Sequence, residues 1–235
     1  MRGIGVDGWL QRWLPPACQL CDAPGAPDAL CAGCLADLPW IRSACRRCAR
    51  PLSEPGECGR CLRRPPPWSA AIVPLAWTFP VDALVSRFKY AGGLQHGWLL
   101  GRLLAIACAG RRPDALLPVP LHSARLAERG FNQSAELARP VSRQLGVRVL
   151  HHACRRVRAT PAQAGLSAAQ RRRNLAGAFV ASPEVSGLAI AVVDDVLTTG
   201  ATATALAAAL LAAGARDVEL WAVARGGTAP RRAAA

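Results

Sequence analysis

Eight of the ten cysteines in this 235-residue chain form four Cys-x-x-Cys pairs near its amino terminus. Gaps of 9, 10 and 9 residues separate successive pairs, so the pattern nearly repeats. Two thiolates separated by two residues on a tight turn converge on one tetrahedral metal ion, and two such turns complete a four-cysteine zinc site. The spacing therefore predicts two structural zinc ions, held by Cys18, Cys21, Cys31, Cys34, Cys45, Cys48, Cys58 and Cys61.

Disulfide bonds are the alternative use of these cysteines, but they suit secreted domains rather than a chain in which no signal peptide is recognised. Sequential pairing of the four turns would build two stacked zinc ribbons, whereas interleaved pairing would build a cross-braced, RING-like domain. The near-equal gaps favour the duplicated ribbon. The two remaining cysteines, Cys108 and Cys154, stand alone and are expected to be small buried apolar residues.

A second chemical pattern lies in residues 191–202, which read Ala-Val-Val-Asp-Asp-Val-Leu-Thr-Thr-Gly-Ala-Thr. It predicts a strand, an acidic pair, a hydroxyl-rich turn and a helix. Backbone N–H groups and threonine hydroxyls at a helix N-terminus can hold a phosphate, and Gly200 lets the backbone approach it. Asp194 and Asp195 can accept hydrogen bonds from vicinal sugar hydroxyls and hold Mg²⁺ through water. The string favours a ribose 5-phosphate site over a simple helix cap.

Strands and helices are expected to alternate in the chain that positions this loop. Expected strands cover 69–77, 115–120, 147–150, 178–181, 188–193 and 218–223, and expected helices cover 81–90, 98–109, 133–145 and 202–213. This alternation predicts an α/β fold with a parallel sheet flanked by helices. Ligands in such sheets bind beyond the carboxyl ends of the strands, which is where the acidic pair and the turn would lie.

A proline-rich spacer at 63–67 divides the chain into an expected zinc-ribbon domain, 1–66, and an expected sheet domain, 67–235. The metals would supply most of the folding energy of the first domain. The chain has 29 Lys+Arg against 15 Asp+Glu, a net charge of +14, of which +11 falls in 67–235. Anionic partners are therefore expected for the second domain, although the shortage of lysine alone also suits a GC-rich genome.

Membrane insertion and secretion are not expected, because no uninterrupted run of 18 apolar residues occurs and the amino terminus carries Asp7 without a continuous apolar stretch. Trp9, Leu10, Trp13 and Leu14 are expected to form a short amphipathic helical turn that packs onto the protein itself. The expected location is the cytoplasm.

Residues 191–202 resemble the signature with which type I phosphoribosyltransferases bind phosphoribosyl pyrophosphate (PRPP), and other motifs resemble the ComF family. These motifs occur in the family's order at Phe88–Gly92, Pro118–Leu121, Arg125, Arg129–Ser134, Gln163, Arg171–Asn174 and Ala178–Phe179. The family also opens with a Cys-rich zinc region, so the resemblance covers nearly the whole chain. It implies a type I phosphoribosyltransferase fold behind a double zinc ribbon, and a role linked to DNA uptake in natural transformation.

The resemblance also implies roles for individual residues. Asp194 and Asp195 would bind the ribose hydroxyls of Mg²⁺-bound PRPP. The 5-phosphate would lie on the loop after them, formed by Thr198, Thr199, Gly200, Ala201 and Thr202. The loop from Pro120 to Ser134 would bind pyrophosphate, and within it Arg129 and Asn132 are expected to be catalytic because the turn at Gly130 projects both from one bend.

A basic segment, 155–176, would be the mobile loop that closes over the site. Arg171 and Arg173 in this segment are expected to be catalytic, because they could neutralise pyrophosphate as it leaves. The alternative is a solvated basic surface. Lys89, the only lysine, could simply end a helix and extend its charged group into solvent.

Phosphoribosyl transfer from PRPP to an unidentified acceptor is the expected activity. A 6-oxopurine acceptor is not expected, because Thr198 stands where enzymes for such bases carry an acid, and a threonine cannot act as a general base near neutral pH. A single-stranded-DNA-binding competence protein that keeps the PRPP pocket, or a PRPP-sensing regulator, are the alternatives. The expected partners are PRPP, single-stranded DNA and other DNA-uptake proteins.

Overall fold

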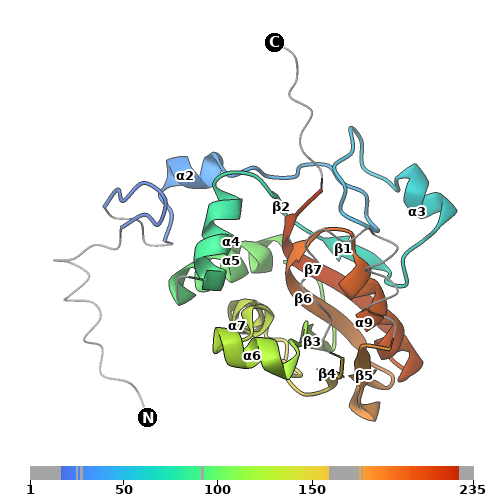
Figure 1. Ribbon diagram of the computed structural model, residues 1–235. Coiled ribbons are helices and arrows are strands. Elements are labelled where there is room, and N and C mark those ends of the chain that lie inside the picture. Colours follow the sequence, from blue (N-terminus) through green and yellow to red (C-terminus); the bar gives the residue numbers. More distant parts are fainter. Residues whose placement is uncertain are drawn as a thin grey trace. The chain divides into compact units, whose positions relative to one another are not determined.

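A computed structural model describes residues 17–24, 26, 29–90, 93–158, 175 and 177–227 (Figure 1). By compactness the chain divides into two units, Met1–Pro39 and Trp40–Ala235. The described part of the first unit contains one short helix, α2 (Ala32–Ala36). The second unit contains the second group of cysteines together with the sheet. The functional boundary between metal-binding and sheet domains after residue 66 stays a prediction.

A parallel sheet of five strands forms the centre of the second unit. Its members are β1 (Ala70–Ile72), β2 (Leu75–Ala76), β3 (Ala115–Pro118), β6 (Ala189–Leu197) and β7 (Asp217–Arg225). The strand order is β1-β7-β6-β3, and β2 pairs with the carboxyl end of β7. The two long central strands are mostly buried and apolar, as expected for parallel strands covered on both faces.

Helices cover both faces of this sheet, with α9 on one face and α4, α5 and α7 on the other (Figure 1). The helices of the second unit are α3 (Gly59–Arg63), α4 (Val81–Tyr90), α5 (Leu94–Ala107), α6 (Ser123–Arg129), α7 (Gln133–Leu145) and α9 (Ala201–Ala212), with a 3₁₀ turn, η1 (Pro183–Val185). Ile190 and Val192 of β6 pack in one core with Leu206 and Leu210 of α9. The predicted fold class is confirmed, because a parallel sheet lies between helices in a chain that also carries two four-cysteine clusters.

Two expected strands are absent from the parallel sheet. Residues 147–150 make only an isolated bridge between Val149 and Leu116, and the chain then bends at 151–153. Residues Phe179–Ala181 form β5, which pairs antiparallel with β4 (Cys154–Arg156) in a separate two-stranded sheet. The strand expected at 178–181 therefore forms, but in this second sheet, whereas the strand expected at 147–150 is reduced to the single bridge.

Strand β6 continues four residues beyond the expected end at Val193. Asp194 pairs with Ala222 of β7, and Val196 pairs with Ala224, so the acidic pair lies within the strand rather than after it. Helices α4 and α7 match the expected ranges. Gly146 ends α7 in the left-handed conformation, as its position after the helix predicts. Within the described residues, no helix has both the length and the apolar character needed to cross a membrane.

Candidate functional site

The eight cysteines form two separate clusters, and each cluster combines two consecutive Cys-x-x-Cys pairs. One candidate ligand atom from each member lies within 4.8 Å of the others, in the sets Cys18, Cys21, Cys31, Cys34 and Cys45, Cys48, Cys58, Cys61. The sulfur atoms of Cys21 and Cys31, and those of Cys48 and Cys58, are 3.7 Å apart. Tetrahedral zinc with Zn–S bonds of about 2.3 Å requires sulfur atoms about 3.8 Å apart, so the clusters fit zinc. Sequential pairing is confirmed.

Backbone N–H groups prepare both clusters to hold thiolates. The amide of Cys34 donates to the sulfur of Cys31 at 3.5 Å, and the amide of Cys58 donates to the sulfur of Cys45 at 3.3 Å. Burial raises the pKa of Cys18, but hydrogen bonds from backbone amides and from Cys21 outweigh it and lower that pKa to about 6, whereas hydrogen bonding with Cys21 raises the pKa of Cys34. Thiolates are the form that binds zinc, so these contacts favour metal binding near neutral pH.

The two isolated cysteines are buried, as expected. Burial raises the pKa of both thiols, in Cys154 to about 11, so they stay protonated and unreactive.

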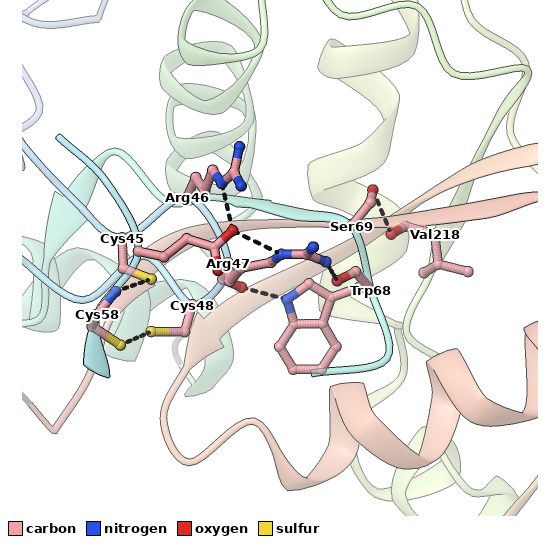
Figure 2. Close-up of polar contacts among 9 residues, drawn as sticks. Cys45, Arg46, Arg47, Cys48, Cys58, Trp68, Ser69 and Val218 are labelled. Atoms are coloured by element: carbon pink, nitrogen blue, oxygen red, sulfur yellow. Dashed lines mark hydrogen bonds and ion pairs between the residues drawn. The ribbon is translucent and has the colours of Figure 1, made fainter. Parts of the chain in front are cut away.

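The second cluster is joined to the sheet through the turn between Cys45 and Cys48 (Figure 2). Arg46 and Arg47 in this turn both pair with Glu57, at 2.6 and 3.3 Å. The indole Nε1 of Trp68 donates to the carbonyl of Arg47 at 2.6 Å, and the Arg47 guanidinium donates back to the Trp68 carbonyl at 3.1 Å. The next residue, Ser69, donates through its hydroxyl to the carbonyl of Val218 in β7 at 3.2 Å (Figure 2).

The hydroxyl-rich turn lies between β6 and the N-terminus of α9, as the sequence predicts. Gly200 is the N-cap residue, with a φ of 78° in the left-handed region. The hydroxyl of Thr199 accepts from the amide of Ala201 at 3.4 Å, and Thr204 donates to the Gly200 carbonyl at 2.8 Å. A hollow of about 30 Å³ is lined by Asp194 and residues 196–203. We call residues 198–202 the phosphate loop, after the role that the sequence predicts for them at a helix N-terminus.

The acidic pair is held by residues from two helices. The Nζ atom of Lys89 in α4 lies 2.7 Å from Oδ2 of Asp195. The hydroxyl of Ser134 in α7 donates to Oδ1 of Asp194 at 3.4 Å, and the same oxygen accepts from the Asp195 amide at 2.9 Å. Burial, followed by the neighbouring charge of Asp195, raises the pKa of Asp194 to about 7. The alternative that Lys89 simply extends into solvent does not hold, because the half-buried Asp195 pairs with it.

A cavity of about 260 Å³ adjoins the acidic pair. Its lining includes both aspartates and five basic or amide side chains: Lys89, Arg125, Arg129, Gln133 and Arg156. The Oε1 atom of Gln133 accepts from Arg129 at 3.1 Å, so the amide nitrogen of Gln133 is directed away from Arg129. This nitrogen is buried and has no hydrogen-bond partner within the described part of the chain. Cations and a buried donor beside two carboxylates suit a ligand with both phosphate oxygens and hydroxyls.

The expected catalytic residues have different surroundings. Arg129 lines the cavity. Asn132 caps α7 by accepting from the Ser134 amide at 3.0 Å, and its Nδ2 donates to the Val119 carbonyl at 3.1 Å. Both amide atoms of Asn132 are therefore engaged with the backbone. Arg171 and Arg173 lie outside the described residues, as does most of the segment 155–176. The catalytic roles of all four stay predictions.

Sequence reasoning missed Arg225 and Trp68, which connect the second cysteine cluster to the phosphate loop. Arg225 ends β7 and is only 5% exposed. Its Nε donates to the carbonyl of Cys48 at 3.0 Å. The one signal for Arg225 in the sequence is a charged residue at the end of the apolar run 220–224. Its contact with Cys48 could not be read from the sequence, because the two residues lie 177 positions apart.

Comparison with solved structures finds a likeness to glutamine PRPP amidotransferase from B. subtilis. The TM-score is 0.38 and the identity 21%, over 53% of this chain and 25% of that one. A second match, described as the allosteric regulatory enzyme of purine biosynthesis, has the same TM-score at 20% identity, over 54% of this chain and 25% of that one. The chain thus spans about a quarter of the length of these structures.

Comparison of sequences gives closer matches. The model of the double zinc ribbon domain matches residues 9–62, which contain both cysteine clusters. DNA utilization protein YhgH of Salmonella typhi is 39% identical over 171 residues, 70% of this chain and 75% of that protein. Competence protein F of Haemophilus influenzae is 33% identical over 210 residues, 85% of this chain and 92% of that protein. Similarity of this extent to Competence protein F shows that the chain belongs to the ComF family.

Proposed function

We propose that the protein binds PRPP with Mg²⁺ and transfers its phosphoribosyl group to an acceptor, releasing pyrophosphate. The observation that carries this proposal is the continuity of β6, the phosphate loop and α9. One short stretch of chain presents two carboxylates at one end and helix N-terminal amides at the other. A sugar phosphate carries vicinal hydroxyls and a phosphate at opposite ends, which matches this arrangement.

Each part of the site has a role in this proposal. The phosphate loop holds the 5-phosphate, and Asp194 and Asp195 accept from the ribose hydroxyls. Bound Mg²⁺, held through water by the same carboxylates, would neutralise charge on the pyrophosphate. The cations of the 260 Å³ cavity stabilise the negative charge that gathers on the leaving pyrophosphate. The bond from the anomeric carbon to pyrophosphate breaks, and the acceptor's nucleophile forms the new bond with inversion.

Calorimetric titration with PRPP and Mg²⁺ tests the binding step. Asp194→Asn and Asp195→Asn should each weaken binding by tenfold or more, because each removes a charged hydrogen-bond acceptor. Asp114→Asn is the matched control, since Asp114 pairs with Arg216 at the amino end of the sheet, away from the site. Equal affinity in all four proteins would contradict the proposal. Pyrophosphate release in the presence of candidate acceptors then separates transfer from binding alone, which a PRPP-sensing regulator would show.

Single-stranded DNA binding is a second candidate function. The net charge of +11 on residues 67–235 and the names of the two relatives favour it. Each phosphate neutralised on a single strand contributes about −0.7 to the slope of log affinity against log salt, so three contacts would give about −2. Replacing Arg171–Arg173 with glutamine should flatten that slope. Absence of binding at low salt would rule this candidate out. Binding whose affinity depends neither on salt nor on the triple replacement would also rule it out.

A further inference from the structure

Arg225 connects two parts of the molecule that have different chemistry. Its Nε donates to the carbonyl of Cys48 in the second cysteine cluster, at 3.0 Å. Its Nη1 lies 2.7 Å from the carbonyl oxygen of Leu197 and 2.6 Å from that of Thr198, and it also bonds the carbonyl of Gly226. A guanidinium is planar and holds its donors in fixed directions. The position of Cys48 therefore constrains the residues at which the phosphate loop begins.

Trp68 supplies a second connection between the same two parts. Its indole N–H and carbonyl both bond Arg47, which lies between Cys45 and Cys48 (Figure 2). The far edge of its ring, Cη2, lies 3.3 Å from the point that a Cβ on Gly200 would occupy. The ring therefore packs directly against the backbone of the phosphate loop, and its own position depends on the cysteine turn.

The remaining space behind the loop is largely open. A cavity of about 530 Å³ has Cys48, Arg225, Thr199 and Gly200 in its lining. A cavity of this size removes packing partners from the loop, so the contacts of Arg225 and Trp68 hold it in place. If those contacts loosen, the loop has room to move.

Charge also links Arg225 to the metal. A buried cation is costly unless opposite charge or hydrogen bonds compensate it. Four thiolates around Zn²⁺ carry a net charge of −2, and two of them, from Cys48 and Cys61, line the same cavity as Arg225. Loss of the metal removes the bonds that fix the four sulfur atoms, which frees the Cys45–Cys48 turn and the carbonyl of Cys48 that Arg225 contacts.

We propose that Arg225 is a positioning residue, which makes the order of the phosphate loop depend on metal in the second cysteine cluster. With zinc bound, Cys48 fixes the guanidinium, the guanidinium fixes the carbonyls of Leu197 and Thr198, and the loop amides converge on one phosphate. Without zinc the loop loses this alignment. The consequence for ligand affinity rests on the proposed function, whereas the consequence for loop order does not.

Hydrogen exchange of the ligand-free protein tests loop order directly. Cys58→Ser removes a ligand from the second cluster, and Cys21→Ser is the matched loss from the first. We expect amides 199–203 to exchange about tenfold faster in Cys58→Ser, which corresponds to about 1.4 kcal/mol, and at the native rate in Cys21→Ser. Arg225→Met should reproduce the faster exchange with both zinc ions still bound. Arg60→Met is its control, since Arg60 is exposed and lines the same cavity.

Trp68→Phe is a milder second variant if Cys58→Ser or Arg225→Met fails to fold. It keeps an aromatic ring at this position but removes the N–H bond to Arg47 and the far ring edge that faces Gly200, so exchange at 199–203 should rise by a smaller factor than in Arg225→Met. Native exchange in Arg225→Met and in Trp68→Phe would overturn the proposal. So would equal acceleration in Cys21→Ser and Cys58→Ser.

Affinity for ribose 5-phosphate is the second readout. We expect it to fall about tenfold in Arg225→Met and to be unchanged in Arg60→Met. If the wild-type protein binds neither ribose 5-phosphate nor PRPP, the proposed function fails, and the exchange experiment still decides the role of Arg225. If the wild type binds and Arg225→Met binds equally well with native exchange, the proposed function stands and the role of Arg225 is rejected.

Discussion

Lys89 and Asp195 form an ion pair of 2.7 Å that joins α4 to β6 beside the candidate phosphate site. Their side chains are only 19% and 15% exposed, so solvent screens the pair less than it would a surface ion pair. The charge of Lys89 also opposes the rise in the pKa of Asp194, which burial and Asp195 cause. Lys89 therefore favours the ionised form of Asp194.

Removing Lys89 should shift the pH dependence of ligand binding. Ionised Asp194 accepts from ribose hydroxyls, so wild-type affinity for PRPP should rise as the pH passes about 7. In Lys89→Met the pKa of Asp194 rises further, and the midpoint of the binding curve should move to higher pH. Titration calorimetry over a pH series measures this midpoint. Arg87→Met loses the same charge on an exposed part of α4 and should leave the midpoint unchanged.

Replacing Asp194 should stabilise the ligand-free protein at high pH. The pKa of this carboxyl is about 7 in the folded chain and 3.8 as its ordinary value. The folded state thus keeps a proton that the unfolded state releases, and stability falls as the pH rises between those two values. Asp194→Asn removes this dependence, so its gain in Tm should be larger at about pH 8 than at about pH 5. An equal gain at both pH values would contradict the assignment.

Replacing Gly200 with alanine should damage binding as well as stability. Gly200 has a φ of 78°, and an added Cβ would lie 3.3 Å from Trp68. Gly146, with a φ of 69° and nothing within 4 Å of an added Cβ, is the matched control. Both alanine variants should lose about 1 kcal/mol in urea unfolding from the left-handed backbone alone. Only Gly200→Ala should also lose affinity for ribose 5-phosphate.

Replacing Gln133 with glutamate tests its unpartnered amide nitrogen. The change turns a buried donor into an acceptor and brings a carboxylate to Arg129. We expect affinity for pyrophosphate to fall by tenfold or more, because a donor is lost and a negative charge is gained. The Tm should be unchanged or higher. Gln144→Glu, on an exposed turn of the same helix, should leave pyrophosphate affinity unchanged. A similar loss of affinity in that variant would show that added negative charge alone causes the effect, and that the amide of Gln133 has no part in binding.

Metal analysis should find two zinc ions per chain, and one in either Cys21→Ser or Cys58→Ser. The two variants should differ in stability. Cys58 belongs to the compact unit that contains the sheet, so its loss should lower the main unfolding transition, whereas loss of Cys21 should not. Metal-free protein with its cysteines paired as disulfides would contradict both expectations.

Features with a local cause were predictable from the sequence. Gly146 stops α7, and the short gaps between cysteine pairs place consecutive turns close enough to share a metal. The phosphate loop was also predictable, because Gly200 and its threonines occur together between an apolar strand and an alanine-rich helix.

Features that depend on distant partners were not predictable. Asp194 and Asp195 belong to β6 because β7 continues to pair beside them. Residues 189–197 alone do not indicate that the pairing extends so far. Likewise, the partners of Arg225 and Lys89 come from distant parts of the chain. Single-sequence patterns register apolar spacing and turns, whereas these contacts arise only when the sheet assembles.

Strand β7 is the last strand among the described residues, yet it pairs with β1, β2 and β6 in the middle of the sheet. During synthesis β1 and β2 therefore leave the ribosome before the strand that they pair with, and Cys48 leaves it before Arg225. The sheet and its link to the second cysteine cluster can close only after β7 has been made. A chain truncated before Asp217 would lack β7, so β1 and β2 would have no strand to pair with in this sheet. We expect such fragments to aggregate rather than retain partial function.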